Sequence, residues 1–145
     1  MKKLIFLVFL LIGFFSVAKA DTLDYWHVYY NQVKVVELNT FSKEELTIKV
    51  SDKDKIDFLL DYLFIIYVND TPCSNCEGFV FVDNTQGQTI TTGKSKGTST
   101  PIKIAFSSVV QYYQRTKNKY YDVFYIERGE YEKPDKVLLF RLKLE

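Results

Sequence analysis

Hydrophobic and polar positions alternate along much of the chain after residue 24, with the period of two that is typical of β-strands. The first such stretch comprises Tyr25–Tyr30, the pair Asn31-Gln32, and Val33–Leu38. Two alternating runs separated by two turn residues predict a β-hairpin. In the first run, residues 25, 27 and 29 share one face of the predicted strand, and residues 26, 28 and 30 share the other.

The centre of the chain carries two apolar runs, Tyr62–Val68 and Phe79–Val82, joined by a segment that is rich in turn residues. Both runs consist of β-branched and aromatic residues, which favour strands. Residues 51–68 also show helical spacing, so a helix there is the alternative, and it would make the domain α+β. We prefer a strand from about Leu59 onward, because consecutive β-branched and aromatic residues are poor helix formers.

Further alternating runs predict strands over residues 46–50, 88–92, 101–106, 120–127 and 136–144. Residues 93–100 are small and polar and are expected to form a loop, whereas residues 107–116 are compatible with one or two helical turns. Eight or nine short strands, with turn signals about every ten residues, indicate an all-β fold. We expect an antiparallel β-sandwich, immunoglobulin-like or related, with one short helix at most.

The first twenty residues have the pattern of a secretory signal peptide. Lys2 and Lys3 precede twelve residues without charge (4–15), and the segment ends in Ala18-Lys19-Ala20. Twelve helical residues reach about 18 Å, which is short of the roughly 30 Å of a bilayer core. The sequence therefore predicts cleavage after Ala20, a secreted or periplasmic protein, and one domain over residues 21–145. Since no cysteine lies near the cut, a lipoprotein anchor is not expected.

The charge balance argues against a nucleic-acid partner. The whole chain has 19 Lys and Arg against 18 Asp and Glu. Removal of residues 1–20 takes away three lysines and no acid, which moves the formal charge from +1 to −2. Nucleic-acid binding generally needs a basic stripe. We also expect no membrane span after the predicted cleavage.

The two cysteines, Cys73 and Cys76, allow three interpretations. In an exported protein the default is a structural disulfide, which here closes a four-residue loop worth about 2 kcal/mol of chain entropy. A thiol-disulfide redox role is the alternative, although redox cysteines usually open a helix that follows a strand. A zinc site needs two more ligands. With one histidine and no further cysteine in the chain, zinc is not expected.

The chain offers little for catalysis or metal binding. The single histidine, His27, lies in the middle of a predicted strand and is interpreted as a packed or surface residue. The nearest candidates for a calcium site are Asp52, Asp54 and Asp57, since Ca²⁺ takes oxygen ligands. Lysines alternate with these carboxylates, so a solvated charged turn is the preferred interpretation. We expect no cofactor and no metal, and we expect a non-enzyme.

Aromatic residues are the most unusual feature of the composition, with 11 Tyr and 12 Phe among 145 residues. Tyrosine suits interfaces because its ring packs while its hydroxyl reaches water or a partner. We therefore expect a non-catalytic binding or structural module that contacts an unidentified protein or glycan, with a calcium-dependent module as a further alternative. The predicted contact residues are Tyr25, Trp26, Tyr29, Tyr30, Tyr121 and Tyr125.

Overall fold

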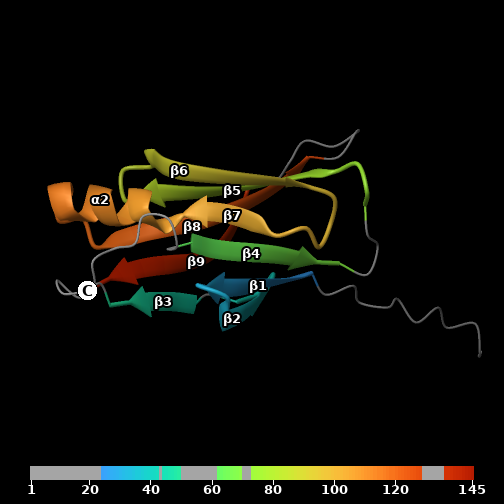
Figure 1. Cartoon of the computed structure of the whole chain (residues 1–145), viewed down its shortest axis with the longest axis horizontal. Coiled ribbons are helices and arrows are strands. Elements are labelled where there is room, and N and C mark those ends of the chain that lie inside the picture. Colours follow the sequence, from blue (N-terminus) through green and yellow to red (C-terminus); the bar gives the residue numbers. More distant parts are fainter. Residues whose placement is uncertain (1–23, 43, 50–61, 70–72, 129–135) are drawn as a thin grey trace, which may run out of the picture.

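The computed structural model describes residues 24–42, 44–49, 62–69, 73–128 and 136–145. The predicted signal peptide and the residues Asp52, Asp54 and Asp57 lie outside the described residues. Of residues 51–68, for which a helix is the alternative, residues 62–68 form the preferred strand, and residues 51–61 lie outside the described residues. Within them, nine strands form two packed sheets, so the predicted β-sandwich is confirmed (Figure 1).

Sheet A has four strands in the order β2-β1-β4-β7. All its pairings are antiparallel. The predicted hairpin is present as β1 and β2, and Asn31 and Gln32 both have positive φ (46° and 71°), as the mirror-image turn of a two-residue hairpin requires. The strands of sheet A are β1 (Tyr25–Tyr30), β2 (Val33–Asn39), β4 (Tyr62–Val68) and β7 (Ile102–Ala105).

Sheet B has five strands in the order β3-β9-β8-β5-β6. It is antiparallel except at its edge, where β3 runs parallel to β9. The strands are β3 (Glu44–Ile48), β5 (Glu77–Asn84), β6 (Thr89–Lys96), β8 (Tyr120–Arg128) and β9 (Val137–Leu144). The helix α2 (Phe106–Thr116) follows β7 and lies at one end of the sandwich, beside β5 and β6 (Figure 1).

The core lies between the sheets, where alternate residues of β1, β4, β5, β7 and β8 are buried. Trp26 of sheet A packs against Tyr67 of its own sheet and Tyr125 of sheet B, with ring centroids 5.3 Å and 5.7 Å away. The indole Nε1 of Trp26 is buried without an acceptor in the described part of the chain. The helix adds Phe106, Val109 and Val110 to the same core.

The two central apolar runs belong to different sheets, β4 to sheet A and β5 to sheet B, so the cysteine segment crosses between sheets. Two expectations are corrected by the structure. The expected loop over 93–100 begins later, since β6 continues to Lys96. The helix has eleven residues, about three turns, rather than one or two.

The edges of the two sheets meet at Gly93 in β6. A Cβ atom built on Gly93 would lie 2.6 Å from the carbonyl oxygen of Lys103 and 2.8 Å from Cγ2 of Ile102, both in β7. Real side chains do not approach this closely, so β6 packs directly on β7 because residue 93 has no side chain. The glycine that made residues 93–100 look like a loop is thus a packing residue of a strand.

Candidate functional site

The outer face of sheet A carries a group of neighbouring aromatic rings. The pairing register places Tyr29 of β1 directly opposite Phe64 of β4, whose ring centroid lies 6.2 Å from that of Tyr62, whereas Tyr25 lies at the other end of β1, opposite Val68. His27 stands between the two β1 tyrosines, with ring centroids 5.7 Å from Tyr25 and 6.4 Å from Tyr29. All these side chains are half-buried. We call Tyr25, His27, Tyr29, Tyr62 and Phe64 the aromatic face.

Charged side chains border the aromatic face on both sides. On the β2 side, Glu37 accepts from Lys34 and lies 3.0 Å from Nε2 of His27. Lys34 chiefly, and His27 to a lesser degree, lower the pKa of the Glu37 carboxyl. On the β7 side, the ammonium of Lys103 lies 3.5 Å from the centroid of the Tyr62 ring, a cation–π contact. The aromatic face is therefore a row of rings, interrupted by one imidazole, with charged side chains at its rim.

Three of the six predicted contact residues are core residues. Trp26, Tyr121 and Tyr125 are 3%, 1% and 5% exposed, so they are removed from the candidate surface. Alternation did separate Trp26 from Tyr25 and Tyr29, but it could not say which face was buried. Tyr30 also points inward, with its ring 5.2 Å from that of Phe106. Tyr25 and Tyr29 remain at the surface.

Burial raises the pKa of the three tyrosines that close the core. The pKa of Tyr121 rises to about 12, and those of Tyr67 and Tyr125 rise further, with loss of hydration as the largest cause. The Tyr121 hydroxyl donates to the carbonyl of Asn118 at 2.7 Å, and the Tyr125 hydroxyl donates to Glu127 at 3.1 Å. These phenols have structural partners.

Cys73 and Cys76 form a disulfide, as predicted. The backbone of the cysteine loop pairs with the β6–β7 connection, since Cys73 and Cys76 accept from the amides of Thr98 and Gly97 at 2.9 Å and 2.8 Å. These backbone hydrogen bonds therefore join two connections that pass between the sheets, the one from β4 to β5 and the one from β6 to β7. The element that follows Cys76 is strand β5 rather than a helix, so the usual setting of a redox-active cysteine is missing from residues 73–84.

A Gly-x-Ser-x-Gly pattern, typical of serine hydrolases, runs from Gly93 to Gly97 and was not among the sequence candidates above. In a hydrolase the serine occupies a strained turn between a strand and a helix. Here Ser95 lies in the regular pairing of β6 with β5, opposite Gly78, and its φ is not positive. His27 belongs to the other sheet. The geometry at Ser95 is that of a strand residue.

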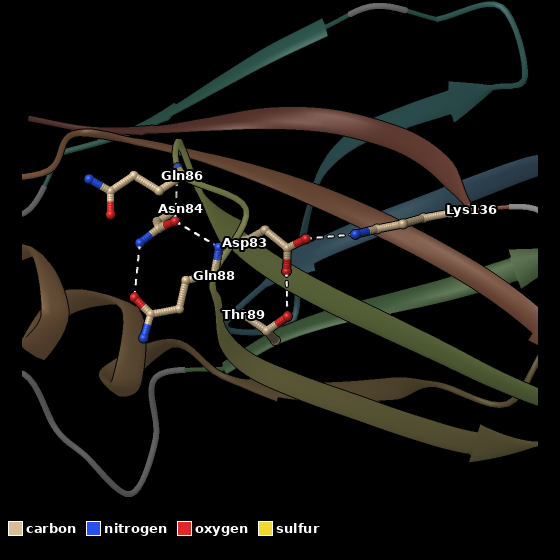
Figure 2. A network of polar contacts seen from close by, with 6 residues as sticks. All are labelled: Asp83, Asn84, Gln86, Gln88, Thr89 and Lys136. Atoms are coloured by element: carbon tan, nitrogen blue, oxygen red, sulfur yellow. Dashed lines mark hydrogen bonds and ion pairs between the residues drawn. The ribbon is translucent and has the colours of Figure 1, made fainter.

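Asp83 is the buried carboxylate of sheet B, with 5% of its side chain exposed. Figure 2 shows its two oxygens bound by different partners: Lys136 Nζ lies 2.7 Å from Oδ2, and Thr89 Oγ1 donates to Oδ1 at 2.7 Å. Across the described ranges, no three His, Cys, Asp or Glu side chains gather as metal ligands would. Asp83 is thus held as one half of an ion pair.

A polar recess lies between α2 and the β5–β6 hairpin. Its volume is about 380 Å³. Four helix residues line one wall at spacings of three and four, and three hairpin residues line the other; we call this the α2–hairpin recess. The lining residues are Ser108, Gln111, Tyr112 and Arg115 of the helix, with Gln88, Thr89 and Ile90 of the hairpin.

The buried amide of Asn84 holds both walls of this recess. It donates to the Tyr112 hydroxyl at 2.8 Å and to Oε1 of Gln88 at 3.3 Å. Its own oxygen accepts from the backbone amides of Gln86 and Gln88, both at 2.9 Å (Figure 2). No sequence signal was drawn from these residues, although the i, i+3, i+4, i+7 spacing of 108, 111, 112 and 115 marks one face of a helix.

Comparisons with known proteins give no match: no family model, no curated protein and no solved structure resembles this chain at a significant level. Among the described residues, no helix is long and apolar enough to cross a membrane.

Proposed function

We propose that the chain is an exported, non-catalytic binding module that contacts another protein through the aromatic face. The observation that carries this proposal is the row of rings along the outside of sheet A, in which His27 links Tyr25 to Tyr29, and Phe64 lies opposite Tyr29 and beside Tyr62. An outward-facing group of aromatic rings costs solubility, so it needs a reason beyond the fold.

The composition of this surface favours a protein partner. Aromatic residues are enriched at the centre of protein interfaces, and charged residues lie at the rim. The aromatic face has this arrangement, because Lys34 and Glu37 flank it on one side and Lys103 on the other. Tyr and Phe rings also bury large areas with little loss of side-chain entropy, which suits interface anchors.

Export is part of the proposal and is supported by two features. The first twenty residues have the composition of a signal peptide, and disulfides persist in oxidising compartments. The Cys73–Cys76 bridge fits such a compartment. N-terminal sequencing of the protein secreted by an expressing host tests this part, with Asp21 expected as the first residue.

The test of the contact surface compares the two outer faces of the sandwich. A photo-crosslinking residue replaces Lys103, beside Tyr62, or Thr92 on the outer face of sheet B. We expect the Lys103 position to give one discrete protein adduct in the native extracellular fraction, identified by mass spectrometry and reproduced with the purified partner. The Thr92 position should not give this adduct.

Two double variants with matched chemistry complete the test. Tyr25→Ser with Tyr29→Ser should reduce the adduct at least tenfold, whereas Phe79→Ser with Phe81→Ser, which removes a comparable ring pair from the outer face of sheet B, should leave it unchanged. Equal adducts from both positions, no adduct, or an unaffected Tyr25/Tyr29 variant would each overturn the proposal. Retention on an immobilised polysaccharide that depends on Tyr25 and Tyr29 would replace the protein partner by a glycan.

A further inference from the structure

We infer that the α2–hairpin recess binds an acidic sugar, that is, a small saccharide carrying a carboxylate, such as a uronic acid. This site shares no residue with the aromatic face and goes beyond the function proposed above. Its volume of about 380 Å³ lies at the small end of the roughly 300–1,000 Å³ range of ligand pockets. A mono- or disaccharide is the size of ligand that such a recess holds.

The donors in the recess are positioned before any ligand arrives. Asn84 is 3% exposed, and its amide uses both of its donors and accepts two backbone bonds. The side chain of Asn84 therefore cannot rotate without losing hydrogen bonds, and it holds the side chain of Gln88 and the hydroxyl of Tyr112 in place. Since Gln88 already receives a bond at Oε1, its NH₂ group is left to donate. A preorganised set of donors lowers the entropic cost of binding.

The Tyr112 hydroxyl gives the recess one further directed donor. Its oxygen accepts from Asn84 at 2.8 Å, and among the described residues it donates to none. A phenol that accepts one bond can point its hydrogen at a ligand oxygen. Its ring also supplies an apolar surface beside Ile90, against which the C–H groups of a sugar ring can pack.

Charge selects the ligand within the wider class of polyols. Arg115 is the one charged residue among the seven that line the recess, and it forms no ion pair with a described residue; its guanidinium lies 5.6 Å from the centroid of the Tyr112 ring. The nearby carboxylate of Asp83 is already neutralised by Lys136. A guanidinium binds a carboxylate through two parallel hydrogen bonds.

The remaining side chains recognise hydroxyl groups rather than a second charge. Gln88 and Gln111 offer amides, and Ser108 offers a hydroxyl, each of which can donate and accept. Sugar hydroxyls also do both, so these groups match a polyol. A neutral sugar leaves Arg115 without a partner, and a simple carboxylate leaves the amides without one. A ligand that carries both a carboxylate and hydroxyl groups gives Arg115 and the amide side chains a partner at the same time.

The experiment is an NMR titration of isotope-labelled protein, recovered from expression of the whole chain, with glucuronate, glucose and acetate in parallel. We expect saturable shifts of the amide signals of residues 88–90 and 108–115 with glucuronate. The dissociation constants for glucose and for acetate should be at least fivefold weaker. The Arg115→Gln variant should weaken glucuronate at least fivefold and leave the weaker glucose binding unchanged.

A pair of variants on the same helix separates recognition from helix stability. Gln111 lines the recess, whereas Gln114 is exposed and does not line it. Gln111→Ala should weaken glucuronate at least threefold, and Gln114→Ala should not change it. The inference is overturned if glucuronate gives no saturable shifts, if acetate or glucose binds equally well, if the shifts lie outside the recess, or if both glutamine variants behave alike.

Discussion

At the scale of single residues, Asp83 shows how this chain places a charge in a sheet that is rich in phenylalanine. The carboxylate is 5% exposed, and a buried charge is tolerated only when it is paired and hydrogen-bonded. The ammonium of Lys136 meets this need and also lies 3.9 Å from the centroid of the Phe124 ring. Lys136 thus contacts both the Asp83 carboxylate and the ring of Phe124.

Removing the lysine should therefore be costly. We expect Lys136→Met to lower the free energy of unfolding by about 2–3 kcal/mol, because Asp83 keeps only the hydrogen bond from Thr89. The double variant Asp83→Asn with Lys136→Met should regain most of this loss. Urea denaturation of the three proteins measures both values. Lys94→Met, at an exposed lysine of the neighbouring strand, is the control and should cost less than about 0.5 kcal/mol; an equal cost there would contradict the pairing argument.

At the scale of elements, the hairpin and most strands were predictable because their signals are local. Alternation and the Asn31-Gln32 pair define β1 and β2, and both turn residues take the positive φ that the hairpin needs. The strand β6 was cut short in the prediction because Gly93 and its polar neighbours look like a loop. Glycine is needed at position 93 because β7 packs closely against β6 there. The residues around position 93 give no sign of this contact.

That close approach gives a prediction for Gly93→Ala. The added methyl group would stand 2.6 Å from the Lys103 carbonyl oxygen, so β6 and β7 must separate. Overpacking of this kind costs about 1–3 kcal/mol, and chemical denaturation should show the loss. Thr92→Ala, at the exposed neighbouring position, should cost less than half as much. If the two variants are equally stable, β6 and β7 are not in contact at this glycine.

The candidate sites were predictable only in part, because they combine residues that are far apart in the sequence. Tyr25 and Tyr29 follow from alternation, but the burial of Tyr121 and Tyr125 depends on which side of sheet B meets sheet A. The α2–hairpin recess combines a helix with a turn more than fifteen residues earlier. The polar face of α2 could have been read from its spacing, whereas the wall opposite it could not.

At the scale of the whole molecule, the buried tyrosines make stability depend on alkaline pH. An unfolded phenol ionises near pH 10, whereas burial raises the pKa of Tyr121 to about 12 in the folded protein and raises those of Tyr67 and Tyr125 as well. Above pH 10 the unfolded chain loses protons that the folded chain retains, so stability falls as the pH rises.

We therefore expect the melting temperature to fall between pH 10 and pH 12, while it is insensitive to these phenols at lower pH. Near-UV circular dichroism during thermal unfolding measures this dependence. Tyr121→Phe should reduce the steepness of the fall, although it also removes the hydrogen bond to Asn118 at every pH. A slope identical to that of the unchanged protein would show that Tyr121 does not contribute.

The topology of sheet B also fixes an order of events during synthesis. The strand β9 (Val137–Leu144) lies inside the sheet, between β8 and the parallel edge strand β3, and the amide of Glu145 donates to the carbonyl of Ile48. Until Leu144 has emerged, β3 has no strand to pair with and one side of β8 is open. Contacts over such a separation form slowly, so we expect the sandwich to close only after β9 has been synthesised. That delay would suit the export proposed above, in which the polypeptide passes a narrow translocation channel as an extended thread.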